Sequence, residues 1–254
     1  MPVFFVPPHS LTPPVVSITG TLLTHLRDSL RLAVGEMILL SDGGDHRYRT
    51  EVTAMTKHAL TGRVVEVIAR PTRQAPVLIL GQALLKGERM DWVIQKSTEL
   101  GVQTIFPIQS RRSIVHLKAE RIETQTARWQ RIALEAAQQS EQWDVPTIAG
   151  PLPLSPHTLP CAAYTLALIL TERRAAAGAL SDITLPASPV ESILVLVGPE
   201  GGWEDEEVAI AEKAGCIPIT LGPRILRAET AAMLSIGLLQ YRLGELGWQK
   251  EGRG

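Results

Sequence analysis

A glycine-rich turn is the segment whose residue types point most directly to ligand binding. Residues 198–202 read Gly-Pro-Glu-Gly-Gly, and they separate an apolar run from a stretch with helical periodicity. Turns at the carboxyl ends of parallel strands are where α/β proteins bind ligands, and glycines let a ligand approach the backbone. No Lys-Ser or Lys-Thr pair of a phosphate-binding loop follows, and acids crowd residues 204–207. A neutral or cationic ligand therefore fits better than a phosphate; a plain strand-to-helix connection is the alternative.

A second turn of this kind carries two arginines and a glutamate. Residues 221–231 read Leu-Gly-Pro-Arg-Ile-Leu-Arg-Ala-Glu-Thr-Ala, again between an apolar run and a helical pattern. Arginines in a short apolar loop can stabilise negative charge that develops during a reaction. The alternative is a salt bridge at the start of the helix, with Arg227 paired to Glu229.

The positive charge that could contact a polyanion is local. The whole chain has a formal charge of −1, which excludes a polycation that coats nucleic acid, and its 4% aromatic content argues against a base-stacking surface. Residues 104–131, however, hold six Lys and Arg against two Glu, beginning with Arg111 and Arg112. This stretch is a candidate for phosphate contacts.

Polar groups also gather near one predicted helix, at residues 86–90 and 95–101. They could belong to a functional site or could simply form a solvated helix face.

Cysteines and histidines indicate neither a disulfide framework nor a metal site. Cys161 and Cys216 are too few for a four-cysteine zinc site, and their apolar neighbours predict buried, inert thiols. The six histidines lack metal-ligand spacing, so we expect no metal. With no signal-peptide pattern and no apolar run long enough to span a membrane, we expect a cytoplasmic protein without membrane contact.

The elements that must position these turns fall into two parts. Residues 1–70 contain short β-rich runs, a helical piece at 24–32 and a hairpin signal at 42–45, which together predict a small barrel. Strands are then expected at 77–82, 104–109, 164–170, 193–197 and 217–221. They alternate with helices at 88–100, 119–139, 204–214 and 229–243, which predicts an α/β domain with a parallel sheet. Two prolines place a linker near 70–76, and we expect domains at 1–72 and 75–248.

Three motifs in order resemble the RsmE family. They are the two turns above and residues 95–102, Gln-Lys-Ser-Thr-Glu-Leu-Gly-Val; residues 25–31 with Gly35 and Glu36 also look like the family's first helix and turn. The resemblance implies a methyltransferase that uses S-adenosyl-L-methionine to methylate N3 of a uridine in small-subunit (16S) ribosomal RNA, in the 30S subunit or its RNA. It further implies a PUA-like N-terminal β-barrel, a C-terminal SPOUT domain with a trefoil knot, and a homodimer.

The same resemblance assigns roles to residues. Arg227 would stabilise the uracil anion, and Glu229 would orient Arg227 or accept the proton. Arg31, Arg111, Arg112 and Arg224 would contact RNA. The knot loops would bind the cofactor through Leu170, Thr171, Glu172, Val197, Gly198, Pro199, Glu200, Gly201, Gly202, Leu221, Gly222, Ile225, Leu226, Thr230 and Ala231.

Two departures from the family pattern remove positive charge. Val3 stands where an arginine is frequent, and Glu141-Gln142 replaces a Gly-Arg pair. Both bear on RNA contact rather than on the cofactor site.

Two alternative functions remain. One is that of another SPOUT methyltransferase, which acts on a tRNA base or a ribose 2′-hydroxyl. The other is that of a non-catalytic RNA-binding ribosome assembly factor.

Overall fold

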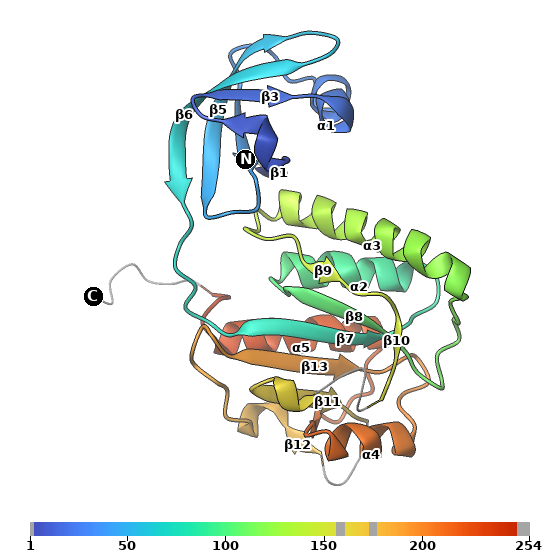
Figure 1. Cartoon of the computed structure of the whole chain (residues 1–254). Coiled ribbons are helices and arrows are strands. Elements are labelled where there is room, and N and C mark those ends of the chain that lie inside the picture. Colours follow the sequence, from blue (N-terminus) through green and yellow to red (C-terminus); the bar gives the residue numbers. More distant parts are fainter. Residues whose placement is uncertain (1–2, 156–160, 173–176, 248–254) are drawn as a thin grey trace. The chain divides into compact units, whose positions relative to one another are not determined.

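The computed structural model describes residues 3–155, 161–172 and 177–247. The chain divides into two compact units, which Figure 1 shows in sequence colours. The first comprises Met1–Thr72 together with Ala137–Val145, and the second comprises Arg73–Ala136 and Pro146–Gly254. We describe each unit by itself.

The first unit is a curled six-stranded sheet around its own apolar core. The strand order is β1-β4-β5-β6-β3-β2, in which β1 pairs with β4 in parallel and the other pairs are antiparallel. Leu26, Leu40 and Leu60 are completely buried in this core. The strands are β1 (Val3–Phe5), β2 (Leu11–Thr12), β3 (Val15–Ile18), β4 (Met37–Ser41), β5 (His46–Met55) and β6 (Leu60–Ala69).

The predicted hairpin is confirmed, whereas the predicted helix at 24–32 is shifted. Residues 42–45 join antiparallel β4 and β5, and Asp42 Oδ1 accepts the Gly44 N–H at 2.9 Å. The helix α1 (Gly20–Thr24) begins earlier and continues as a π-helical turn, His25–Ser29. Gly20, with a φ of 69°, lets the chain enter the helix soon after β3, and Arg31, with a φ of 52°, has already left it.

The segment 137–145 belongs to the first unit because arginines from the barrel hold it. The Arg47 guanidinium lies 4.0 Å from the centre of the Trp143 ring and donates to the Glu141 carbonyl at 2.8 Å. Arg70 forms a two-point ion pair with Asp144. Planar stacking and forked hydrogen bonds are what a guanidinium provides and an ammonium does not.

The second unit is a parallel sheet with the order β10-β8-β7-β13-β11-β14-β12, and β9 pairs with β8. Every pairing is parallel, which confirms the predicted α/β class. The strands are β7 (Val77–Ala83), β8 (Thr104–Gln109), β9 (Thr147–Ile148), β10 (Leu152–Pro153), β11 (Leu166–Leu170), β12 (Gly178–Ala179), β13 (Ser192–Val197) and β14 (Ile217–Thr220). The expected strand at 164–170 is shorter because Cys161–Ala163 form a 3-10 turn, closed by the Tyr164 N–H on the Cys161 carbonyl.

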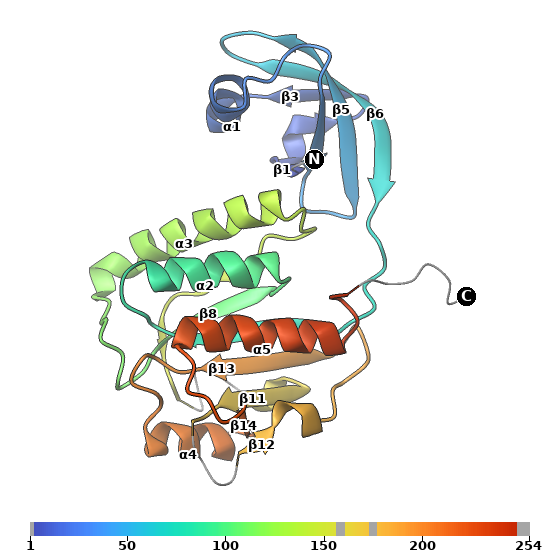
Figure 2. The same cartoon turned by 180° about the vertical axis from the view of Figure 1, so that it is seen from behind.

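Helices cover this sheet. They are α2 (Glu88–Glu99), α3 (Ala119–Gln139), α4 (Asp205–Lys213) and α5 (Ala228–Arg242), close to the predicted bounds. Figure 2 shows α5 in front of β13; it packs against β13 and α2, while α4 packs against β14. Of the loops that the resemblance assigns to the trefoil knot, the first continues into residues 173–176, outside the described residues.

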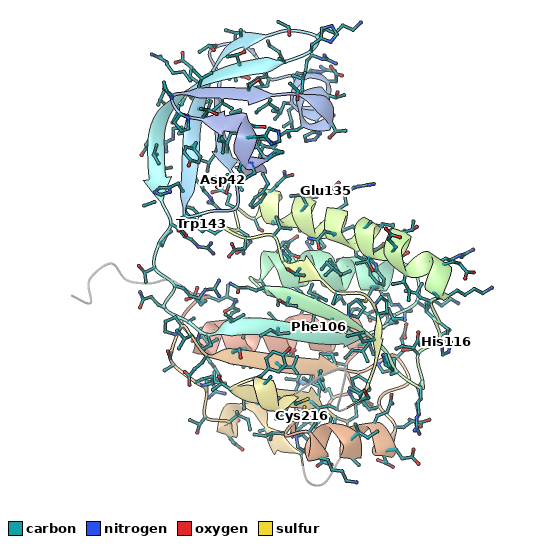
Figure 3. The ribbon with its side chains drawn as sticks, in the orientation of Figure 1. Asp42, Phe106, His116, Glu135, Trp143 and Cys216 are labelled. Atoms are coloured by element: carbon teal, nitrogen blue, oxygen red, sulfur yellow. The ribbon has the colours of Figure 1, made fainter. Side chains whose placement is uncertain are left out.

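The two cysteines meet in the core beneath α4, where Figure 3 labels Cys216. Both are free and buried, as predicted, and Cys216 Sγ donates to Cys161 Sγ at 2.7 Å. This bond and burial raise the pKa of the Cys216 thiol, because both favour its protonated form. No described helix is long and apolar enough to cross a bilayer.

Candidate active site

Three loops of the second unit enclose one pocket at the carboxyl end of the sheet. Because β13, β11 and β14 are neighbours, the segments that follow them emerge side by side. They line a cavity of about 670 Å³, within the range of small-molecule sites. The expected cofactor residues that line it are Leu170, Thr171, Glu172, Val197, Gly198, Pro199, Glu200, Gly201, Gly202, Leu221, Gly222, Ile225, Leu226 and Ala231. Thr230 is not among the lining residues, although its neighbours Glu229 and Ala231 are.

The glycines of the first turn are required for two physical reasons. A Cβ on Gly198 would lie 3.3 Å from the Trp203 ring, and one on Gly201 would lie 3.2 Å from Arg112 Cβ. Gly202, with a φ of 70°, occupies a backbone region that side chains disfavour. The turn is therefore packed tightly on one side while its other side faces the pocket.

The acids after this turn cap the helix α4. The Glu204 side chain accepts from the backbone of the first turn, and the Glu207 carboxylate accepts the Glu204 N–H at 2.9 Å. Such a capping box satisfies N–H groups that have no partner within the helix. The acids that argued against a phosphate ligand thus also have a structural role.

Arg111 is paired with acids that follow the glycine turn. Its guanidinium donates to Glu204 at 3.1 Å and also to Glu206, and these bonds raise its pKa. It does not line the pocket, and its charge is already paired, which argues against a phosphate contact. Arg112 does line the pocket, and its guanidinium donates to the Gly201 carbonyl at 3.2 Å. The first two arginines of the basic stretch therefore contact the glycine turn and the helix after it.

Arg227 and Glu229 both line the pocket but are not paired with each other. Glu229 lies nearest to another cation, Arg89, whose Nε is 3.9 Å from Glu229 Oε1. Arg227 is the N-cap residue of α5, and its exposed side chain has no hydrogen bond or ion pair within the described part of the chain. Among the described residues, Glu229 faces Arg89 and makes no ion pair with Arg227, so the structure gives no support to the expectation that Glu229 orients Arg227. Arg227 is free to contact a ligand.

Sequence reasoning missed several lining residues, of which Arg89 is the most informative. Arg89 donates to Glu200 at 3.0 Å, so it joins α2 to the glycine turn. The only signal was the polar cluster at residues 86–90, which equally fitted a solvated helix face. Four basic and four acidic side chains line the pocket: Arg89, Arg112, Arg224, Arg227, Glu172, Glu200, Asp205 and Glu229. Charges of both signs suit a ligand that itself carries both.

Arg31 is in the other unit. It is exposed in the loop after α1 and has no ion pair among the residues that the model describes. Within those residues there is also no group of three or more His, Cys, Asp and Glu that could hold a metal ion.

Comparisons with known proteins agree for both units. Residues 73–240 match an RNA methyltransferase domain, and residues 18–65 match an RNA methyltransferase PUA domain. A ribosomal RNA small subunit methyltransferase E from Synechocystis is 33% identical over 94% of this chain and 77% of its own length. The protein of the same name from Bacillus subtilis is 29% identical over 90% and 91%.

Solved structures show the same relationship. The ribosomal RNA small subunit methyltransferase E from Neisseria gonorrhoeae, bound to S-adenosyl methionine, superposes with a TM-score of 0.83, at 32% identity over 95% of this chain and 98% of its own. A Legionella pneumophila protein described as a methyltransferase with bound SAM gives 0.84, at 29% identity over 94% and 97%. The two units thus have the predicted PUA-like and SPOUT folds, and the chain belongs to the ribosomal RNA small subunit methyltransferase E family.

Proposed function

We propose that this protein transfers a methyl group from S-adenosylmethionine to N3 of a uridine in small-subunit ribosomal RNA. Family membership supports the reaction class, and the Neisseria relative was solved with this cofactor. The observation that carries the proposal is the pocket, where three loops after neighbouring strands meet. In α/β proteins, ligand sites form where the strand order brings together loops that are distant in the sequence.

The residues present fit this cofactor. The Gly201 turn leaves backbone exposed to the pocket, and the side chains of both signs suit a molecule with two cationic groups and one carboxylate. Glu229 Oε2 is buried without a hydrogen-bond partner, as expected where a ligand supplies one. The turn at 198–202 and the loops beginning at Thr171 and Leu221 would hold it. When bound, S-adenosylmethionine supplies an electrophilic methyl group on a positively charged sulfur.

The protein contributes position and charge to the transfer. An N3–carbon bond forms as the methyl–sulfur bond breaks with its electron pair left on sulfur, and the pocket walls align the reactants for this in-line displacement. N3 must also lose its proton, because it is a weakly acidic imide. Arg227 stabilises the resulting uracil anion. Glu229, with its free buried oxygen, accepts the proton directly or through water.

RNA reaches this pocket only if the uridine is unstacked, since N3 lies on the base-pairing edge. Arg224 lines the pocket without an ion pair among the described residues, and it contacts a phosphate of the substrate. Arg31 of the barrel contacts phosphates further along the RNA. Arg112 also lines the pocket and supports the glycine turn by donating to the Gly201 carbonyl, while its half-exposed guanidinium can still reach a phosphate.

The active form is a homodimer in the cytoplasm. The apolar residues of the last helical stretch predict an interface there through Ala232, Met233, Ile236, Leu239 and Leu243. In the structure Ala232, Ile236 and Leu239 are completely buried within the chain. A different stripe is exposed, namely Leu234, Leu238 and Tyr241, which share one helix face by their spacing of four and three. This stripe is the proposed dimer surface.

Transfer of labelled methyl groups tests the proposal. The full-length protein is incubated with S-adenosylmethionine that carries a labelled methyl group and with 30S subunits, free 16S RNA or tRNA. Label in 16S RNA, free or within 30S subunits, is expected. Label in tRNA would indicate the other methyltransferase class, and no label anywhere would indicate a binding protein.

A further inference from the structure

Three charged side chains from separate elements meet at one wall of the pocket. Arg89 is in the first turn of α2, Glu200 is in the glycine turn, and Glu229 is in the first turn of α5. Arg89 Nη1 lies 3.0 Å from Glu200 Oε1, and Arg89 Nε lies 3.9 Å from Glu229 Oε1. Throughout the described chain, no other Lys, Arg or His comes within 4.0 Å of either carboxylate. One guanidinium therefore connects two acids that are far apart in sequence.

Each carboxylate has one engaged oxygen and one free oxygen. Glu200 Oε1 accepts from Arg89 and from the Lys86 N–H at 3.1 Å, and Glu229 Oε1 faces Arg89. The Oε2 atoms of both residues are buried without a hydrogen-bond partner. Glu229 is only 8% exposed, so solvent does not replace the missing partner. Buried oxygens of this kind normally have partners, because leaving them unpaired costs free energy.

The charges of this cluster do not balance. Two carboxylates and one guanidinium leave one negative charge at a wall where the carboxylate side chains are 18% and 11% exposed and the Arg89 side chain is 46% exposed. Without Arg89, two buried carboxylates would repel each other, and attraction and repulsion are both stronger away from solvent. A ligand that brings a positive charge to this wall would offset the excess negative charge.

We propose that Arg89 is a positioning residue, which holds the negatively charged carboxylates of Glu200 and Glu229 beside the positively charged sulfur of the cofactor. This inference rests on the proposed function and names a residue that determines its cofactor specificity. S-adenosylmethionine carries a sulfonium, whereas the product S-adenosylhomocysteine carries a neutral thioether at the same place. The cluster therefore favours the cofactor over the product, and the attraction is lost once the methyl group has left.

Calorimetry with both molecules tests this role on the full-length protein. Arg89→Ala should weaken S-adenosylmethionine binding on the order of tenfold, because solvent partly screens the half-exposed guanidinium. Binding of S-adenosylhomocysteine should weaken much less. Arg89→Lys should restore part of the affinity, because an ammonium keeps the charge but carries its donors on one nitrogen instead of spreading them over a planar guanidinium.

A matched control and a double variant separate positioning from general stability. Arg128 pairs with Asp91 of the same helix α2 but lies outside the pocket, so Arg128→Ala removes a comparable ion pair and should leave both affinities unchanged. In a Glu200→Gln background the Arg89→Ala loss should shrink, because contacting residues are not additive. If Arg89→Ala fails to fold, Arg89→Lys and Glu200→Gln carry the test, and each should lower the preference for S-adenosylmethionine.

The outcomes distinguish this inference from the proposed function. Wild-type protein that binds S-adenosylmethionine, with Arg89 variants that keep its preference over the product, would overturn the role of Arg89 alone. The role of Arg89 would also be overturned if Arg89→Ala lowered the affinity for both molecules equally and this loss simply added to the loss caused by Glu200→Gln. Wild-type protein that binds no S-adenosylmethionine would overturn both proposals.

Discussion

Gly201 and Arg112 are packed so closely that neither can change without the other. The Arg112 guanidinium donates to the Gly201 carbonyl at 3.2 Å, and a Cβ on Gly201 would lie 3.2 Å from Arg112 Cβ. The arginine thus fixes the far side of the turn whose near side faces the pocket. This relationship explains why a glycine is needed there even though its φ is not in the left-handed region.

Replacing Gly201 by valine should therefore push the turn toward the pocket. We expect cofactor affinity to fall on the order of tenfold, which corresponds to about 1.4 kcal/mol. Unfolding free energy should fall by about 1 to 3 kcal/mol, because the added side chain meets Arg112 Cβ, which can yield only if the Arg112 backbone shifts. Gly178→Val is the control, since nothing lies within 4 Å of a Cβ there. Calorimetric binding that matches wild type would show that the turn serves the fold alone.

Removing the Arg227 side chain should separate chemistry from binding. Because Arg227 has no ion pair within the described residues, Arg227→Ala should leave melting temperature and cofactor affinity nearly unchanged. Loss of one charge-stabilising donor typically lowers the rate on the order of 100- to 1,000-fold. The residual rate should recover partly as pH rises, since solvent base then removes more of the N3 protons. Single-turnover rates against pH check this, and transfer at the wild-type rate would exclude Arg227 from the mechanism.

Substitution of an exposed arginine should weaken RNA binding only where that arginine is not already paired with an acid. Arg31→Gln should weaken RNA binding and reduce the slope of affinity against salt by about one unit. Arg63→Gln is the matched control, because Arg63 pairs with Glu51 at 2.6 Å. Arg111→Gln should also have little effect, since its charge is held by Glu204 and Glu206. Identical salt slopes for Arg31→Gln and wild type would place the phosphate contacts elsewhere.

The exposed stripe on α5 should hold two copies together. Leu238→Glu places a charge in the middle of this stripe, so sedimentation should report the mass of one chain where wild type reports two. Val67→Glu, at an exposed position on β6, should leave the mass unchanged. Wild-type protein that sediments as one chain at micromolar concentration would contradict the proposed dimer.

The sequence predicted the elements of the second unit well because their signals are local. Val195 and its neighbours form an unbroken apolar run, which is what a parallel strand covered on both faces requires. The helix α3 was predicted at its exact bounds, since Trp129, Ala133 and Ala136 recur at helical spacing and are buried. The helix in the barrel was misplaced, because a turn that depends on the φ of Gly20 leaves no periodic signal.

From the sequence, only the loops of the site could be predicted, and not the pairing of its charged side chains. Both unusual turns could be recognised by composition, and they do meet at one pocket. Which charges pair could not be predicted, because Arg89 meets Glu200 and Glu229 only through the strand order of the sheet. The ion pairs of Arg111 could not be predicted for the same reason, since its partners Glu204 and Glu206 lie at the start of α4, far away in the sequence.

Identification of the methylated nucleoside tests the central claim most directly. Small-subunit RNA that lacks the modification is treated with the protein and S-adenosylmethionine, digested to nucleosides and analysed by mass spectrometry against authentic standards. We expect 3-methyluridine, at one methyl group per RNA molecule, and loss of this product in Arg227→Ala. A methyl group on a ribose 2′-oxygen or on another base, or no methylated nucleoside at all, would contradict it.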